Sequence, residues 1–111
     1  KPFMTIGSPG SMRITSAIVQ TVLNIIEFEM GIQEAINSPR IHQYRNAQPE
    51  IESAMSQETI NGLKDLGYFP EVRGGAAGIE LYFGGVQGIL ILDNKFYGGA
   101  DPRRDGKAVG Y

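Results

Sequence analysis

The segment Gly7 to Arg13 constrains the fold of this chain most strongly, because it joins a predicted strand to the longest predicted helix. The residues before it, Phe3 to Ile6, are apolar or β-branched, as expected at the end of a strand. After it, apolar residues recur close to helical spacing, which predicts a helix from about Ser11 to Met30 with Gly31 as its left-handed cap. The sequence therefore predicts a strand, a glycine-containing turn and a helix in direct succession.

This turn is also a candidate anion site. The first N–H groups of a helix have no partner inside it, and the positive end of the helix dipole lies beside them. Pro9 fixes one backbone angle, and Gly10 lets a ligand approach closely. The anion could be a phosphate, a carboxylate or the oxyanion of an acyl-transfer intermediate. Taken alone, the segment favours an ordinary turn capped by Ser8 or Ser11, and it is neither a Walker loop nor a dinucleotide fingerprint.

Composition restricts the classes of partner. The 111 residues, of which 41% are hydrophobic, suit a single segment with a modest core. A net charge of −2 without a basic run argues against nucleic acid, and the polar residues within Ile14 to Met30 argue for a buried helix rather than a membrane span. With no cysteine, one histidine and no clustered carboxylates, we expect neither a metal nor a cofactor. Because Lys1 is not an initiator methionine, we expect a processed product or an excised piece.

Short helices and strands are predicted after Gly31. Residues 32–37 form a helix that ends before Pro39, and Ser56 caps a second helix that runs to about Leu66, with Ile60, Leu63 and Leu66 at core spacing and Gly67 closing it. Gly62 inside that helix either packs closely against a neighbour or makes the helix marginal, unless it is simply a tolerated, exposed glycine. Extended segments are predicted at 40–44, on an exposed edge, and at 48–52, 68–73, 79–83, 86–92 and 95–98, with a flexible connection at 74–78 and a turn at Asp93-Asn94.

Two predictions concern charge and burial. Val86 to Leu92 is nearly continuously apolar, so we expect it to be buried on both faces. His42 has no Ser, Cys or Asp at a diagnostic spacing, which favours a structural over a catalytic role. In the tail, we expect a salt-bridged turn that anchors the C-terminus, with an anion site on Arg103 or Arg104 as the alternative; its members are Asp101, Arg103, Arg104 and Asp105.

Four motifs in register resemble the C-terminal part of the small subunit of γ-glutamyltranspeptidases. They are Gly7–Gly10 with Arg13-Ile14, Ala35–His42, Gly85–Ile89, and Gly98–Gly106 with Ala108–Tyr111. The resemblance covers nearly the whole chain and implies an α+β fold, part of the αββα sandwich of N-terminal nucleophile hydrolases. It also implies a zymogen that cleaves itself. The freed N-terminal threonine then attacks the γ-glutamyl amide of a substrate such as glutathione, and the acyl group passes to water, an amino acid or a dipeptide.

The resemblance assigns few residues of this chain. The nucleophile and the residues that bind the glutamyl group would lie upstream of Lys1 or on the large subunit, so this chain alone is expected to be inactive. What remains is the oxyanion hole, formed by the backbone N–H groups of Gly10 and Ser11. The family has a second glycine where Ser11 stands; a negative φ there would preserve the donor, whereas a positive φ would strain the turn. This departure leaves open a divergent relative that acts on another γ-glutamyl or amide substrate.

The implied partners are the large subunit and the rest of the small subunit of the same precursor, with a γ-glutamyl small molecule as substrate. Family members are commonly exported, which weakly favours an extracytoplasmic location. A second hypothesis is a catalytically silent structural or anion-binding module with the same fold, which associates with copies of itself or with the missing chain.

Overall fold

A computed structural model describes every residue from Lys1 to Tyr111. Its first sheet, called here the hairpin sheet, contains β1 (Met4–Gly7), β5 (Gln87–Leu92) and β6 (Lys95–Ala100) in the order β1-β5-β6, all antiparallel. The predicted turn at Asp93 and Asn94 is confirmed, because both residues have the positive φ angles, 50° and 59°, of a tight hairpin. The N-terminal strand therefore pairs with a strand more than eighty residues later in the chain.

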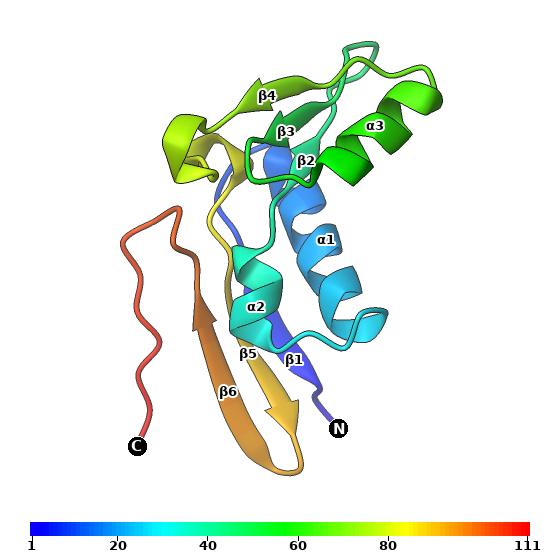
Figure 1. Ribbon diagram of the computed structural model, residues 1–111. Helices are drawn as coiled ribbons and strands as arrows, with labels where there is room; N and C mark the ends of the chain where they lie inside the picture. The colour runs from blue at the N-terminus through cyan, green and yellow to red at the C-terminus, as the bar shows by residue number, and fades with distance from the viewer.

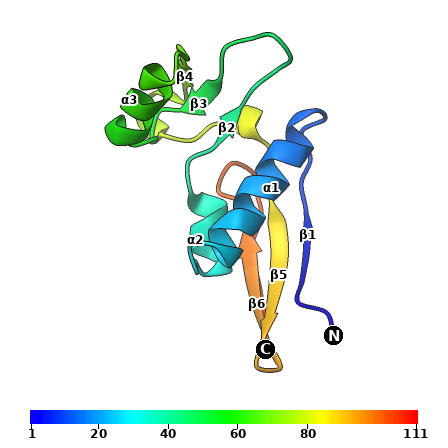
Figure 2. The same cartoon turned by 90° about the vertical axis from the view of Figure 1, so that its right-hand side faces the viewer.

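Two helices cover one face of the hairpin sheet (Figures 1 and 2). They are α1 (Arg13–Ile26) and α2 (Ile32–Asn37). Gly88 and Gly99 allow α2 to approach the strands, since an added Cβ would lie 2.9 Å from a side-chain carbon of Ile32 and 2.6 Å from one of Ile36, respectively. The resulting core contains Ala17, Ile25, Ile32, Ala35, Ile36, Val86 and Leu90.

The opposite face of the hairpin sheet has no helix over it. Ile89 and Phe96 are 40% and 75% exposed, although the C-terminal tail approaches this face at Ala108, beside Gly98. The prediction that the strand from Val86 to Leu92 is buried on both faces is therefore wrong within this chain. One face packs on the helices, and the other lacks the layer that a nearly all-apolar strand requires.

A second, smaller sheet lies at one end of the molecule, next to α3 (Figures 1 and 2). This mixed sheet contains β2 (Ile41–His42), β3 (Glu50–Glu52) and β4 (Glu71–Arg73), in which β2 and β3 are antiparallel and β3 and β4 are parallel. The predicted exposed edge at 40–44 is wrong, because Arg40 and His42 are both buried. Alternation alone cannot distinguish an edge strand from one covered by residues distant in sequence.

The helix α3 (Gln57–Asp65) begins and ends as predicted. Ser56 accepts a hydrogen bond from the Thr59 N–H, and Gly67 closes the helix with a φ of 92°. The expected core packing of this helix is wrong, because none of its residues is buried and Leu66, directly after it, is 76% exposed. Gly62 is exposed with no atom near its missing Cβ, so it does not pack closely against a neighbour and is an exposed glycine.

Other corrections concern helix ends and short turns. The first helix begins two residues later and ends four residues earlier than expected, at Arg13 and Ile26, and Gly31 is the N-cap of α2 with a φ of −63°, not a left-handed cap. Residues 79–83 contain the 3₁₀ helix η2 (Leu81–Phe83) instead of a strand, and the connection at 74–78 contains η1 (Gly75–Ala77). None of the helices has the length and hydropathy needed to span a membrane.

Candidate functional site

The turn between β1 and α1 has an unusual backbone. Gly10 has a φ of 130° and Ser11 a φ of 54°, so two consecutive residues lie at positive φ. A side chain at Gly10 is excluded twice, by that angle and by Gly84, whose Cα would lie 3.3 Å from an added Cβ. Ser11 falls in the strained case named above, because a residue with a Cβ occupies a left-handed conformation.

The carbonyl groups of this turn are used, whereas its first N–H groups are free. The N–H of Arg13 donates to the Gly10 carbonyl at 3.0 Å, and that of Ile14 donates to the Ser11 carbonyl at 3.1 Å. The N–H groups of Gly10 and Ser11 have no acceptor within the chain. No acidic side chain lies in the first turn of α1, so the positive end of the helix dipole is uncompensated.

The alternative of a serine-capped turn is not what the structure contains. Met12 occupies the N-cap position and makes no side-chain cap. The Ser8 hydroxyl instead donates to the Pro9 carbonyl at 2.7 Å and accepts from the N–H of Gly85 at 3.1 Å. Ser8 thus ties the turn to the buried segment that follows η2.

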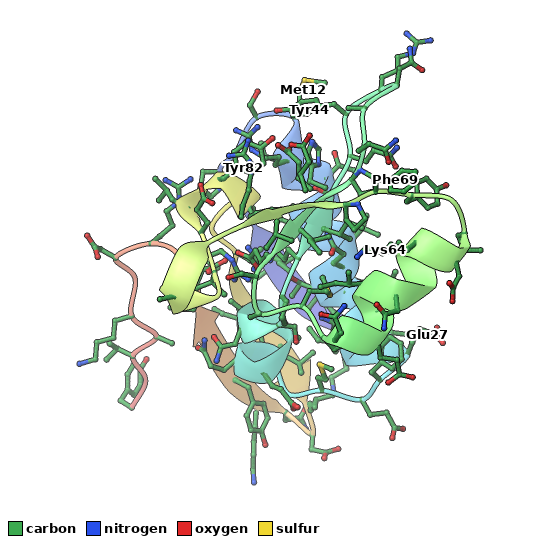
Figure 3. All side chains as sticks on the ribbon, turned by 45° about the horizontal axis from the view of Figure 1, so that its top comes forward. Met12, Glu27, Tyr44, Lys64, Phe69 and Tyr82 are labelled. Atoms are coloured by element: carbon green, nitrogen blue, oxygen red, sulfur yellow. The ribbon has the colours of Figure 1, made fainter.

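Tyr44 and Tyr82 lie at one end of the molecule (Figure 3), in a cluster of aromatic and charged side chains around Arg13, the first residue of α1. Its guanidinium carbon lies 4.1 Å from the centroid of the Tyr82 ring, and its guanidinium donates to the Tyr44 hydroxyl. Tyr82 in turn donates to Glu50, which also accepts from Arg73 at 2.9 Å. Burial and the bond to Glu50 raise the pKa of Tyr82, so this phenol stays protonated.

The lone histidine borders this cluster and has no triad geometry. The Nδ1 of His42 lies 2.9 Å from the Ser16 hydroxyl, which also donates to the Arg13 carbonyl at 3.1 Å. The Nε2 of His42 is buried without a partner, so no carboxylate orients the ring. Burial, and then the charge of Arg13, lower the pKa of His42 and keep it neutral near pH 7. These contacts fit the structural role expected for it.

Four buried charged residues form a second network, which contacts η2 through the carbonyl of Phe83. Arg103 donates to both carboxylate oxygens of Glu52, with its Nε 2.6 Å from Oε1, and lies 3.1 Å from Asp101. Asp101 pairs with Arg40 at 2.7 Å. Burial alone would raise the pKa of Asp101, but hydrogen bonds from the N–H groups of Arg103 and Val86, together with the two arginines, lower it.

This network confirms only part of the predicted tail. The Asp101–Arg103 pair exists and anchors the tail, but Arg104 donates to carbonyl groups at Gly84 and Leu81 and takes no part. Because Arg103 is saturated by carboxylates and carbonyls, it is not a free anion site. Arg40 and Glu52 are not predictable as members of this network from the sequence, since neither lies near the tail and no local pattern marks either as buried.

Comparison with known proteins relates the chain to one family. Residues 1–111 match the family model described as Gamma-glutamyltranspeptidase. The glutathione hydrolase proenzymes of Pseudomonas sp. (strain A14) and Escherichia coli (strain K12) are 38% and 32% identical to all of this chain. A solved mutant of Helicobacter pylori γ-glutamyltranspeptidase superposes with a TM-score of 0.79 at 31% identity, over 92% of this chain and 54% of that one.

These similarities confirm the expected α+β fold, a part of the N-terminal nucleophile hydrolase sandwich. The chain spans only about a fifth of the length of the two proenzymes, 20% and 18%. The two proenzymes are therefore at least about five times as long as this chain.

Proposed function

The chain belongs to the γ-glutamyltranspeptidase family, and we propose that it is the C-terminal part of the small subunit of an enzyme that transfers or hydrolyses γ-glutamyl groups of glutathione-type amides. In this proposal the nucleophile is an N-terminal threonine that lies upstream of Lys1. The α-amino group of this threonine serves as the base that takes up its hydroxyl proton. The contribution of this chain is the oxyanion hole at Gly10 and Ser11. The chain alone has no nucleophile and is inactive.

The observation that carries the proposal is the pair of adjacent N–H groups without acceptors at the start of α1. When the threonine oxygen bonds to the amide carbon, the carbonyl electrons move to oxygen and leave a negative charge there. Two backbone donors stabilise that charge, and the dipole of α1 adds to the stabilisation. Collapse of the intermediate restores the carbonyl and expels the amine, which takes the proton from the α-amino group. Attack by water or by an amine on the acyl-enzyme repeats these steps and uses the same donors.

A second candidate function keeps the fold without the chemistry. The same two N–H groups would hold a phosphate or a carboxylate, so a silent anion-binding module is compatible with this turn. Ser11 favours this candidate, because a strained residue replaces the glycine expected from the family. The proposals differ in the chemistry that the whole protein performs, not in the geometry of this turn.

The proposed partners are the large subunit and the rest of the small subunit. The exposed face of the hairpin sheet supports this part of the proposal, because Ile89 and Phe96 lie on it and no helix covers it. A second sheet packed there would complete a sandwich. Two copies of the chain joined through this face are the alternative, and light scattering of the complete protein distinguishes one copy of the precursor from two.

The function is tested on the protein isolated from its native source. Mass spectrometry of the polypeptide that ends at Tyr111 determines its first residue, and turnover of glutathione is measured on the same preparation. We expect a threonine upstream of Lys1, a separate larger subunit, and release of glutamate or transfer of the γ-glutamyl group. A protein with no such cleavage and no turnover would refute the enzyme and favour the silent module.

A further inference from the structure

We propose that Tyr82 is a positioning residue that holds the Gly10–Ser11 turn in place through Arg13. The proposal rests on the proposed function, because it concerns the same turn. The phenol itself contacts no reacting group. Its role would be to fix the first residue of α1, and thereby the two free N–H groups that precede it.

The ring of Tyr82 lies between two guanidinium groups. The Cζ atoms of Arg13 and Arg73 are each 4.1 Å from the ring centroid. Two planar cations cannot occupy the same face of one ring at this distance, so they lie on opposite faces. The negative face of an aromatic ring attracts a cation, and here both faces are used. The ring therefore holds Arg13 in a defined position relative to β4, from which Arg73 comes.

Arg13 passes that position on to the turn through its backbone. Its N–H donates to the Gly10 carbonyl at 3.0 Å, which closes the turn that contains both free donors. The segment that carries Tyr82 also contacts the turn directly, since Gly84 packs against Gly10 and the N–H of Gly85 donates to the Ser8 hydroxyl. The turn is thus held in two ways: by the backbone of Gly84 and Gly85, which follow η2, and by the side chain of Tyr82 within η2.

The mixed sheet provides the residues that hold Tyr82 in place. Glu50 on β3 accepts from the Tyr82 hydroxyl with one oxygen and from Arg73 with the other. Its negative charge offsets the two cations that face each other across the ring. The mixed sheet therefore contributes to the geometry of the turn, because its strands place Glu50 and Arg73, which fix Tyr82.

Displacing the turn should change kcat more than KM. Donors to an oxyanion act in the transition state, so their misplacement lowers kcat and leaves KM nearly unchanged. A residue that matters only for stability would lower the amount of active enzyme without changing kcat per active site. This distinction separates a positioning role from a structural one.

The test compares Tyr82→Leu and Tyr82→Phe in the complete, mature protein, with kcat referred to active sites titrated by a covalent inactivator. We expect Tyr82→Leu to lower kcat about tenfold with KM within about twofold, and Tyr82→Phe, which keeps the ring, to stay within about threefold of the unsubstituted kcat. Phe69→Leu is the matched control, since Phe69 is an aromatic residue that is 69% exposed and lies apart from Tyr82 (Figure 3).

A kcat for Tyr82→Leu equal to that of the unsubstituted protein would overturn the proposal. If Tyr82→Leu yields no mature protein, Arg73→Gln decides, because the side chain of Arg73 is 38% exposed and lies outside the hydrophobic core. It should lower kcat about threefold with KM unchanged. An unchanged kcat there would count against Tyr82 as a positioning residue.

A second readout does not depend on turnover. Amide hydrogen exchange of the peptide containing Arg13 and Ile14, whose N–H groups are bonded to the turn, should be about tenfold faster in Tyr82→Leu than in the unsubstituted protein. If the unsubstituted protein lacks γ-glutamyl turnover, the proposed function fails while this measurement still decides whether Tyr82 holds the turn. Equal exchange rates would refute the inference.

Discussion

Ser11 is the residue at which this chain departs most clearly from what its turn requires. A left-handed conformation costs a residue with a Cβ about 1–2 kcal/mol, and a glycine loses some of that advantage through its greater freedom when unfolded. We therefore expect Ser11→Gly to raise the free energy of unfolding of the mature protein by up to about 1 kcal/mol, measured by urea denaturation. Because the N–H remains, turnover should persist. Ser11→Val should destabilise, and a stabilised Ser11→Val would contradict the positive φ.

His42 gives the chain a pH-dependent stability with a defined sign. Its folded pKa is lowered by burial and by Arg13, so below its ordinary value of 6.5 the unfolded chain binds a proton that the folded chain does not. Stability should therefore fall as the pH drops through this value and further toward the folded pKa. We expect the Tm advantage of the unsubstituted protein over His42→Gln to be larger at about pH 7.5 than at about pH 5.5. A Tm difference independent of pH would contradict this assignment.

For single residues, local sequence signals predicted the conformation of some turn positions but did not predict which charged residues are buried. Gly10, Gly67 and the Asp93-Asn94 turn were predictable, because a positive φ leaves a mark on the local sequence. The burial of Arg40 and Glu52 was not, because each acquires its partners from segments far along the chain, as in the pairing of Arg40 with Asp101.

Among the elements, α3 offers the cleanest test of an intrinsic preference. Gly62 lies in the helix interior with no atom near the position of a Cβ. Gly62→Ala should therefore stabilise the protein by about 1 kcal/mol, because alanine favours the helix and meets no neighbour. Urea denaturation measures the change. A loss of stability would mean that this face of α3 is covered in the complete protein.

Elements whose ends have local signals agree with the sequence prediction, as α2, α3 and the β5–β6 hairpin do. The predictions are wrong where contacts with distant segments determine the secondary structure. Residues 79–83 alternate like a strand, but Leu81 to Phe83 fold as a 3₁₀ helix whose Tyr82 contacts Arg13 and whose Phe83 carbonyl accepts from Arg40. Periodicity describes one segment at a time and carries no information about such distant contacts.

For the whole molecule, the buried charge network joins the tail to β3 and to the end of α2. Arg103 contacts Glu52, Asp101 and the carbonyl groups of Ile36 and Ser38. Arg103→Met leaves two buried carboxylates without this partner, and we expect a loss of about 3–5 kcal/mol in the free energy of unfolding. Arg104→Met, which removes only long hydrogen bonds to carbonyl groups, should cost less than about 1 kcal/mol. Equal losses in the two variants would show that the network does not anchor the tail.

The two faces of the hairpin sheet differ, because helices cover one and leave the other exposed. The helices α1 and α2 cover one face of the hairpin sheet, and the mixed sheet supports the turn before α1. The open face agrees with a chain that spans about a fifth of its relatives, 20% of the Pseudomonas proenzyme. The fold class and this turn were predictable from sequence motifs, whereas the arrangement of side chains that supports the turn required the structure.

The assignment of Gly10 to the oxyanion hole is tested most directly by kcat per titrated active site for Gly10→Pro in the complete enzyme. Proline removes the N–H of this position and cannot adopt its φ of 130°. Loss of one oxyanion donor should lower kcat by about 100-fold or more. A kcat close to that of the unsubstituted enzyme would contradict the assignment of Gly10 to the oxyanion hole.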